Sequence, residues 1–251
     1  MITSLRRVGL FTVVLSLAQS TSAQPAERLE EIDSLRAEGR YEQAETALRT
    51  MIDQGEDGAD VLWRLSWTLV DLGEQSHGER RNARYNEALP LARKATEQDT
   101  TSAMAWLVRS IAAGRMGLEA GTSDRVELSR EVKEAADRAI ELDSSLDGAY
   151  HVRARWNHEV ASLGFLARTA VRLVYGGLPN ASYEAAVEDF RHAIAIEDRV
   201  LHRMELGRTY QAMGETALAR EQLQRALVME DDDPKADFYR AQARDVLDRL
   251  R

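Results

Sequence analysis

Cysteine is absent from the 251 residues, and proline occurs only four times. Without cysteine the chain can form no disulfide and carry no lipid on a cysteine, so its stability must come from packing. Few prolines, together with abundant Ala, Leu, Glu and Arg, favour helices. Aromatic and β-branched residues nowhere alternate over a run long enough to indicate a strand. The sequence therefore predicts an all-α protein.

Acidic residues outnumber basic ones, with 42 Asp and Glu against 33 Lys and Arg, and the formal net charge is −9. Binding to nucleic acid needs clustered Lys and Arg, which this balance disfavours. The hydrophobic fraction of 44% and the charged fraction of 30% are typical of a soluble, folded chain. We therefore expect no nucleic-acid partner.

The first residues have the pattern of an export signal. Arg6 and Arg7 precede an apolar run from Val8 to Ala18, and small residues follow up to Ala23. This pattern predicts a signal peptide over residues 1–23 and an exported protein, periplasmic or secreted. The run is roughly half of the about 20 apolar residues that cross a bilayer, so no transmembrane span is expected in the mature chain. A retained membrane anchor is the alternative.

Two kinds of helical segment recur along the chain. One has a small residue in the middle of an apolar helix, and the other is rich in alanine. From each landmark of the second kind to the next landmark of the first kind, the distances are 22, 22, 22 and 21 residues, whereas the distances within a pair are 12, 22, 22, 32 and 12. The landmarks of the first kind are Ile32, Ser66, Ser110, Ala154 and Gly207, and those of the second are Ala44, Ala88, Val132, Ala186 and Ala219.

A nearly constant connection between units is expected in a stacked array, because each unit must dock on its neighbour. The turn inside a unit points off the edge of the array and tolerates insertions. The spacing therefore predicts an α-solenoid of about five helix pairs and a capping helix. The units are expected at residues 25–58, 59–102, 103–146, 147–199 and 200–233, and the capping helix at residues 235–251.

Short motifs in these units resemble the tetratricopeptide repeat, whose arrays form right-handed solenoids. The clearest are Gly39-Arg-Tyr-Glu-Gln-Ala44, Leu206-Gly-Arg-Thr-Tyr210 and Ala139-Ile-Glu-Leu-Asp143. The proline that usually closes such a unit is replaced by Thr100 and Ser144.

A narrower resemblance covers roughly residues 100–230. The segments Leu128-Ser-Arg-Glu131, Ala149–Trp156 and Tyr175–Ala186, with Gly176-Gly-Leu-Pro179 as the most specific piece, are similar to the regulator-of-microtubule-dynamics family. The resemblance implies an exported repeat protein of the bacterial type. The link to microtubules belongs to eukaryotic members and is not carried over. The family's other association, with membranes or lipids, implies a lipid as a second class of ligand.

No catalytic constellation is present in the sequence. His158-Glu159 begins like a zinc-protease helix, but Ser162 stands where the second histidine ligand would be. Gly176-Gly177 lacks the Lys and Ser or Thr of a phosphate-binding loop. We therefore expect no enzymatic activity, no cofactor and no bound metal.

The first helices of such pairs line the concave face, where candidate binding residues gather. Trp63 and Trp67 share one helix face, and Leu107 and Ile111 follow from the next unit. They predict an aromatic and apolar groove for a partner segment. The alternative is that these side chains pack in the core or between repeats.

A polar stripe is predicted one unit further along. His151, Arg155 and His158 recur at intervals of four and three, and Arg208 can join them from the fifth unit. Converging basic side chains in an acidic protein indicate capture of a carboxylate or phosphate. The alternative is that local acids such as Glu205 neutralise them.

The insertion from Leu163 to Tyr175 is apolar and basic. Packing across the edge of the unit is the plain interpretation of this insertion, and the alternative is that Phe165, Arg168, Arg172 and Tyr175 form a lid over the groove or a surface that touches lipid. Taken together, the sequence predicts a non-catalytic scaffold whose concave groove, walled by enlarged loops inside the units, holds a peptide or protein partner. The alternative function is a carrier for a lipid or another amphiphile in the same groove.

Overall fold

The computed structural model describes residues 25–250, and the signal peptide predicted at residues 1–23 lies outside them. The described residues form helices and no strand, so the all-α prediction is confirmed. The helices are α1 (Pro25–Ala37), α2 (Tyr41–Asp53), α3 (Ala59–Glu74), α4 (Gly78–Gln98), α5 (Ala103–Glu119), α6 (Thr122–Leu142), α7 (Asp147–Ser162), α8 (Phe165–Tyr175), α9 (Tyr183–Ile196), α10 (Val200–Met213), α11 (Thr216–Val228) and α12 (Ala236–Arg249).

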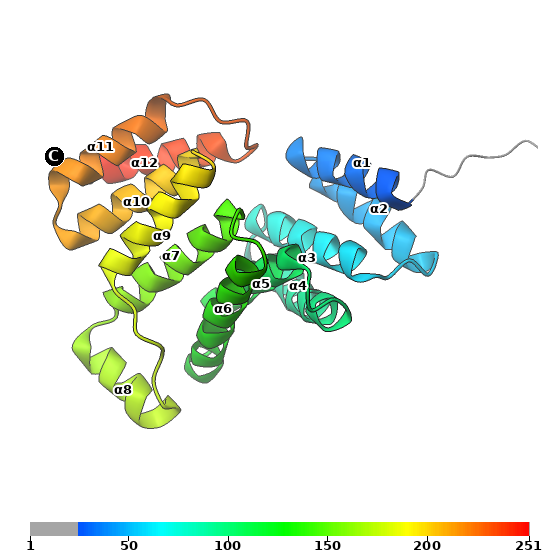
Figure 1. Cartoon of the computed structure of the whole chain (residues 1–251), viewed down its shortest axis with the longest axis horizontal. Helices are drawn as coiled ribbons and strands as arrows, with labels where there is room; N and C mark the ends of the chain where they lie inside the picture. The colour runs from blue at the N-terminus through cyan, green and yellow to red at the C-terminus, as the bar shows by residue number, and fades with distance from the viewer. Residues whose placement is uncertain (1–24, 251) are drawn as a thin grey trace, which may run out of the picture.

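The helices pack as successive pairs, which together form a curved solenoid (Figure 1). The pairs are α1–α2, α3–α4, α5–α6, α7–α9 and α10–α11, and α12 packs on the last pair. The first helices α1, α3, α5, α7 and α10 contact one another in that order, so they form one continuous row. We call the surface of this row, continued by α12, the inner face. Figure 1 shows that the turn between α11 and α12 comes back towards α1.

Small residues stand where the two helices of a pair cross. A Cβ atom at Gly207 would lie 2.7 Å from Cγ of Leu223, so no larger residue fits there without a shift of the helices. Ala154 and Ala186 are both fully buried between α7 and α9. Such close approach is the reason that the spacing of small residues is visible in the sequence.

The turns between units are closed by side-chain hydrogen bonds in place of the usual proline. Oδ1 of Asp99 accepts a hydrogen bond from the backbone N–H of Thr101 at 2.8 Å, and Asp143 accepts one from Ser145 at the same distance. These turns present the next helix at a fixed position. They account for the constant spacing between units.

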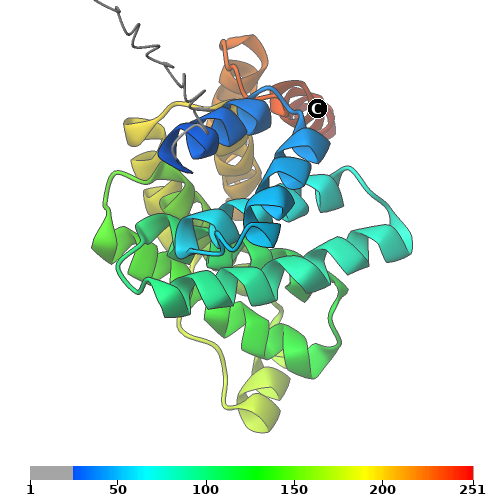
Figure 2. The ribbon, with the colours of Figure 1, turned by 90° about the vertical axis from the view of Figure 1, so that its right-hand side faces the viewer.

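Two of the three insertions lengthen helices, which corrects the prediction of enlarged loops. Helices α4 and α6 each contain 21 residues, whereas α2 and α11 contain 13. Figure 2 shows the long hairpins α3–α4 and α5–α6 stacked on one another. The third insertion forms the separate helix α8. The added residues precede Ala88 in α4 and Val132 in α6, so they extend each second helix at its N-terminal end.

Candidate binding surface on the inner face

The two tryptophans of α3 differ in exposure. Trp63 is only 6% exposed and packs in the main hydrophobic core. Its indole N–H donates to Asp60 at 3.0 Å, and the guanidinium of Arg64 lies 4.1 Å from its ring centre. Trp67 is partly buried beneath Arg36, whose guanidinium lies 4.2 Å from the ring centre. Trp67 is therefore the member of the pair that borders the surface.

The apolar residues predicted beside them serve mainly packing. Leu107 is 3% exposed and belongs to a cluster with Ala139 and Ala149. Ile111 is partly buried against the same cluster. Packing of α5 against α6 and α7 therefore uses most of this apolar surface.

Two histidines occupy the start of the junction between α7 and α10. Nδ1 of His151 lies 2.9 Å from Nδ1 of His202, and Nε2 of His202 lies 2.8 Å from Asp147. Burial lowers the pKa of His151 well below its ordinary value, and the neighbouring His202 and Arg155 lower it further. Because one nitrogen of the facing pair must accept, at least one Nδ1 carries no proton.

The rest of the polar stripe surrounds the buried carboxylate of Glu205. A nitrogen of Arg155 lies 3.5 Å from it, and one of Arg208 lies 3.3 Å from it. His158 contacts Thr209 at 3.0 Å, and burial lowers its pKa. The structure therefore brings the four predicted residues to one junction, where Glu205 pairs with both Arg155 and Arg208, and Glu159 also pairs with Arg155.

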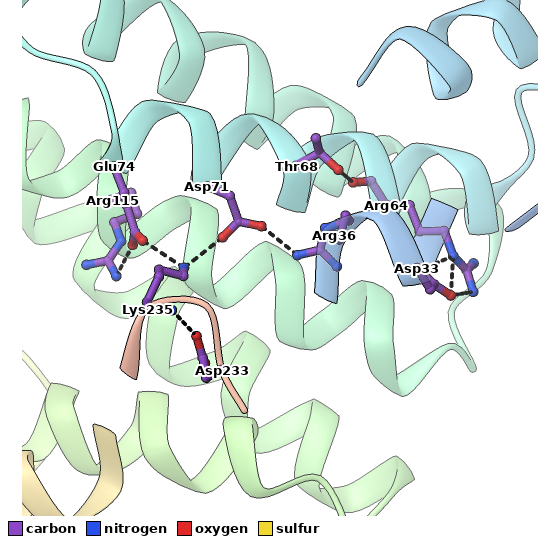
Figure 3. Close-up of polar contacts among 9 residues, drawn as sticks. All are labelled: Asp33, Arg36, Arg64, Thr68, Asp71, Glu74, Arg115, Asp233 and Lys235. Carbon is purple, nitrogen blue, oxygen red and sulfur yellow. Dashed lines mark hydrogen bonds and ion pairs between the residues drawn. The ribbon is translucent and has the colours of Figure 1, made fainter. Parts of the chain in front are cut away.

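A second charged network, which the sequence reasoning missed, lies on the inner face between α1, α3 and α5 (Figure 3). Oδ2 of Asp71 accepts from Arg36 at 2.7 Å, and Oδ1 lies 2.8 Å from the ammonium of Lys235. Glu74 pairs with Arg115 and lies 2.9 Å from Lys235. The available signal was Asp71 itself, an acid that interrupts the apolar run from Leu69 to Leu72 in α3.

A separate ion pair lies nearer the beginning of α3. The guanidinium of Arg64 makes a bidentate pair with Asp33 of α1, with nitrogen–oxygen distances of 3.0 and 2.8 Å, and both side chains appear in Figure 3. Its backbone carbonyl accepts from Thr68 at 2.8 Å. The inner face of the first repeats is thus lined by charged groups held in fixed positions, in contrast to the apolar groove predicted there.

Helix α8 contains all four residues predicted for the insertion surface. Arg172 is exposed and Tyr175 is partly buried, and Phe165 begins the helix. Arg130 of α6 donates to the carbonyl oxygens of Tyr175 and Gly177 and thereby fixes the end of α8. Helix α8 also presents an exposed apolar surface, with exposed fractions of 81% for Leu166, 80% for Leu173 and 68% for Val174.

Two further properties concern the described residues only. Between residues 25 and 250, no three His, Asp or Glu side chains come together as metal ligands would. None of the helices in that range combines the length and the hydropathy needed to cross a bilayer.

Comparisons with known proteins agree with the architecture. A crystal structure of a thermophilic tetratricopeptide-repeat protein from Thermus thermophilus superposes with a TM-score of 0.63 and 19% identity, covering 87% of this chain and 97% of that one. This likeness shows the solenoid fold. The regulator of microtubule dynamics protein 1 of Caenorhabditis elegans is 28% identical over 72% of this chain and 81% of its own length. The protein of the same name in Bos taurus is 26% identical over 81% of this chain and 67% of its own.

The family model matches residues 28–251, well beyond the region in which the motifs were found. Its description is regulator of microtubule dynamics protein 1-3. With this match over nearly the whole solenoid, the chain belongs to the regulator-of-microtubule-dynamics family.

Proposed function

We propose that this protein is a non-catalytic scaffold that holds a segment of a peptide or protein partner on its inner face. The continuous row of first helices carries this proposal, because it presents side chains from α1 to α12 on one curved surface. Fixed charged groups, such as the pairs of Asp71 and Glu205, supply positions that can recognise a complementary segment.

A photo-crosslinking experiment tests where the partner binds. Benzoylphenylalanine replaces Trp67 or Arg155 on the inner face, and in a control it replaces the partly exposed Arg138 of α6. The scaffold proposal expects crosslinks to one partner from both inner positions and not from residue 138. Crosslinks of equal yield from residue 138 would contradict it.

We also propose that the protein acts outside the cytoplasm, in the periplasm or after secretion. The charged start, apolar run and small residues before Gln24 support this. The test is the mass of the mature protein and of its first peptide. A chain that begins at Gln24 supports export with cleavage. A chain that retains Arg6 and Arg7 contradicts export if it is recovered from the cytoplasmic fraction, and favours the retained anchor if it is recovered from the membrane fraction.

A second candidate function is a carrier for a lipid or another amphiphile. It is favoured by α8, whose exposed Leu166 and Leu173 are not covered by the solenoid, and by the absence of acids from Leu163 to Tyr183. Organic extraction of the purified protein followed by mass spectrometry tests it, with one lipid per chain as the supporting result. Leu166→Ser with Leu173→Ser should reduce that lipid, whereas Leu118→Ser, at a site that is 63% exposed on α5, should not.

A further inference from the structure

Lys235 connects the last helix of the solenoid with the first repeats. It lies in the turn before α12, and its ammonium is 2.8 Å from Oδ1 of Asp71 and 2.9 Å from Oε2 of Glu74 (Figure 3). The two acids stand three residues apart at the end of α3, so they share one helix face. These ion pairs join residues that are 164 and 161 positions apart in the sequence.

The contact between the turn before α12 and the first repeats of the solenoid is mainly ionic. Among the described helices, α12 packs on α10 and α11, whereas α1 packs on α2 and α3. The hydrophobic cluster around α12 is separate from the cluster that contains α3. Beside Lys235, Pro234 approaches the turn between α1 and α2, where a Cβ atom at Gly39 would lie 3.3 Å from it. The turn formed by residues 233–235 therefore closes the solenoid without a shared apolar core.

The carboxylates are held in place independently of Lys235. Asp71, which is 2% exposed, uses Oδ2 for Arg36 and Oδ1 for Lys235. Glu74 uses Oε1 for Arg115 and Oε2 for Lys235. If the lysine moved away, two acceptor oxygens would stay aimed at one point and would lack a donor. Carboxylate oxygens that are shielded from water and lack a donor are unfavourable, so another donor would be favoured there.

The surroundings suit a lysine in particular. Burial alone would lower the pKa of Lys235, but Asp71 and Glu74 outweigh burial and raise the pKa above its ordinary value. Oδ1 of Asp71 and Oε2 of Glu74 both contact the single ammonium nitrogen of Lys235, an arrangement that suits a compact cation. The forked guanidinium of arginine is best matched by two parallel hydrogen bonds instead.

We propose that Lys235 is the internal occupant of a binding site for a lysine-bearing peptide segment, formed on the inner face by Asp71 and Glu74. A lysine of the partner takes the place of Lys235, and the turn formed by residues 233–235 withdraws from α3. This inference rests on the proposed function, since it names the chemistry of the segment that the inner face accepts.

A peptide copied from the turn provides the probe. The labelled hexapeptide Glu-Asp-Asp-Asp-Pro-Lys has the sequence of residues 230–235 and is acetylated and amidated. Its affinity is measured by fluorescence anisotropy against the wild-type protein and Lys235→Met. Because the variant removes the ammonium that competes for Asp71 and Glu74, we expect it to bind the peptide at least about tenfold more tightly than the wild type, which corresponds to about 1.4 kcal/mol. Asp71→Asn in the Lys235→Met background should abolish this gain.

Controls separate the site from general effects. Lys94→Met breaks the exposed ion pair with Asp57, at 2.8 Å, and should bind the peptide as the wild type does. A peptide with Met in place of Lys should bind neither protein. Circular dichroism checks folding, and Lys235→Gln replaces Lys235→Met if the latter loses helix. Equal affinity of wild type and variant, no binding to either, or a gain that survives Asp71→Asn would overturn the proposal.

The peptide assay uses no cellular partner, so its outcome is separate from that of the crosslinking experiment. Peptide binding without crosslinks at residues 67 and 155 would support the lysine site and contradict the wider scaffold function. Crosslinks without peptide binding would support the scaffold and overturn the lysine site.

Discussion

The indole N–H of Trp156 on α7 donates to the backbone carbonyl of Ser129 on α6 at 2.7 Å and lies 2.9 Å from the hydroxyl of the same serine. Two of the segments that carry the family resemblance therefore meet in space. A third segment joins them, because Arg130 binds the carbonyl of Gly177 at 2.7 Å and Leu178 packs on the core that contains Trp156. These motifs therefore have a structural role, because they fix α7 and the segment after α8 on α6 of the preceding unit.

The first prediction concerns this lock. Trp156→Phe keeps most of the buried ring but removes the donor to Ser129, whose carbonyl retains only its hydrogen bond within α6, so the free energy of unfolding should fall by about 0.5–1.5 kcal/mol. Trp106→Phe is the matched control, since the indole of Trp106 donates to the carbonyl of Thr100 at an exposed site where water can replace it. Urea denaturation of both variants measures the difference. Equal losses would contradict the assigned role.

The helix pairs could be predicted from the sequence because packing constraints repeat. Ala154 and Ala186 are small because the two helices of their pair cross closely, and the same constraint acts in the other pairs. The turns at Asp99 and Asp143 fix the distance to the next unit. The form of the insertions could not be predicted in the same way. A spacing that grows by ten residues shows how much chain is added, and leaves open whether this chain continues a helix, as in α4, or forms a new one, as in α8.

The second prediction compares two helical glycines. Gly207→Ala should lower the free energy of unfolding by about 1–3 kcal/mol, because the new Cβ atom would meet Leu223 and force α10 away from α11. Gly117→Ala should raise the free energy of unfolding by up to about 1 kcal/mol, since the alanine favours the helix. At Gly117 the nearest atom to a Cβ is 3.7 Å away, an ordinary contact. Thermal and urea denaturation give the signs, and a shared sign would contradict the packing argument.

The candidate site was harder to predict than the fold. Residues of one helix, such as His151, Arg155 and His158, can be grouped from the sequence because helical spacing places them on one side of α7. Their neutralising partner Glu205 comes from another unit, 50 positions beyond Arg155 in the sequence, and such pairing depends on the curvature of the solenoid. The same is true of Lys235 and Asp71, whose contact exists only because the solenoid curves back on itself.

The third prediction separates packing from binding in α3. Trp63→Ala should lower the free energy of unfolding by about 3–5 kcal/mol, because a buried ring is lost from the core. Trp67→Ala should cost less, since that ring is only partly buried. With benzoylphenylalanine at position 155, Trp67→Ala should reduce partner crosslinking by a larger factor than Trp63→Ala does in a sample that remains folded. The reverse order would place the binding contribution in Trp63.

The fourth prediction is a loss of stability at mildly acidic pH. In the unfolded chain His151 takes up a proton as the pH falls through its ordinary pKa of 6.5, whereas in the folded protein burial lowers that pKa and the side chain stays neutral. The unfolded state then binds more protons, so the free energy of unfolding is highest above about pH 6.5 and decreases below it, by at most about 1.4 kcal/mol per pH unit for each such histidine. His158 acts in the same direction, because its pKa is also lowered by burial.

Urea denaturation at pH 7.5, 6.5 and 5.5 measures this dependence. His151→Asn removes the titrating group and keeps an amide that can donate to His202, so the decrease between pH 6.5 and 5.5 should become smaller. His77→Asn, at an exposed position before α4, should leave the decrease unchanged. If both variants kept the wild-type slope, the buried imidazole of His151 would not be the source, and the pH dependence would have to come from His158 or from the carboxylates.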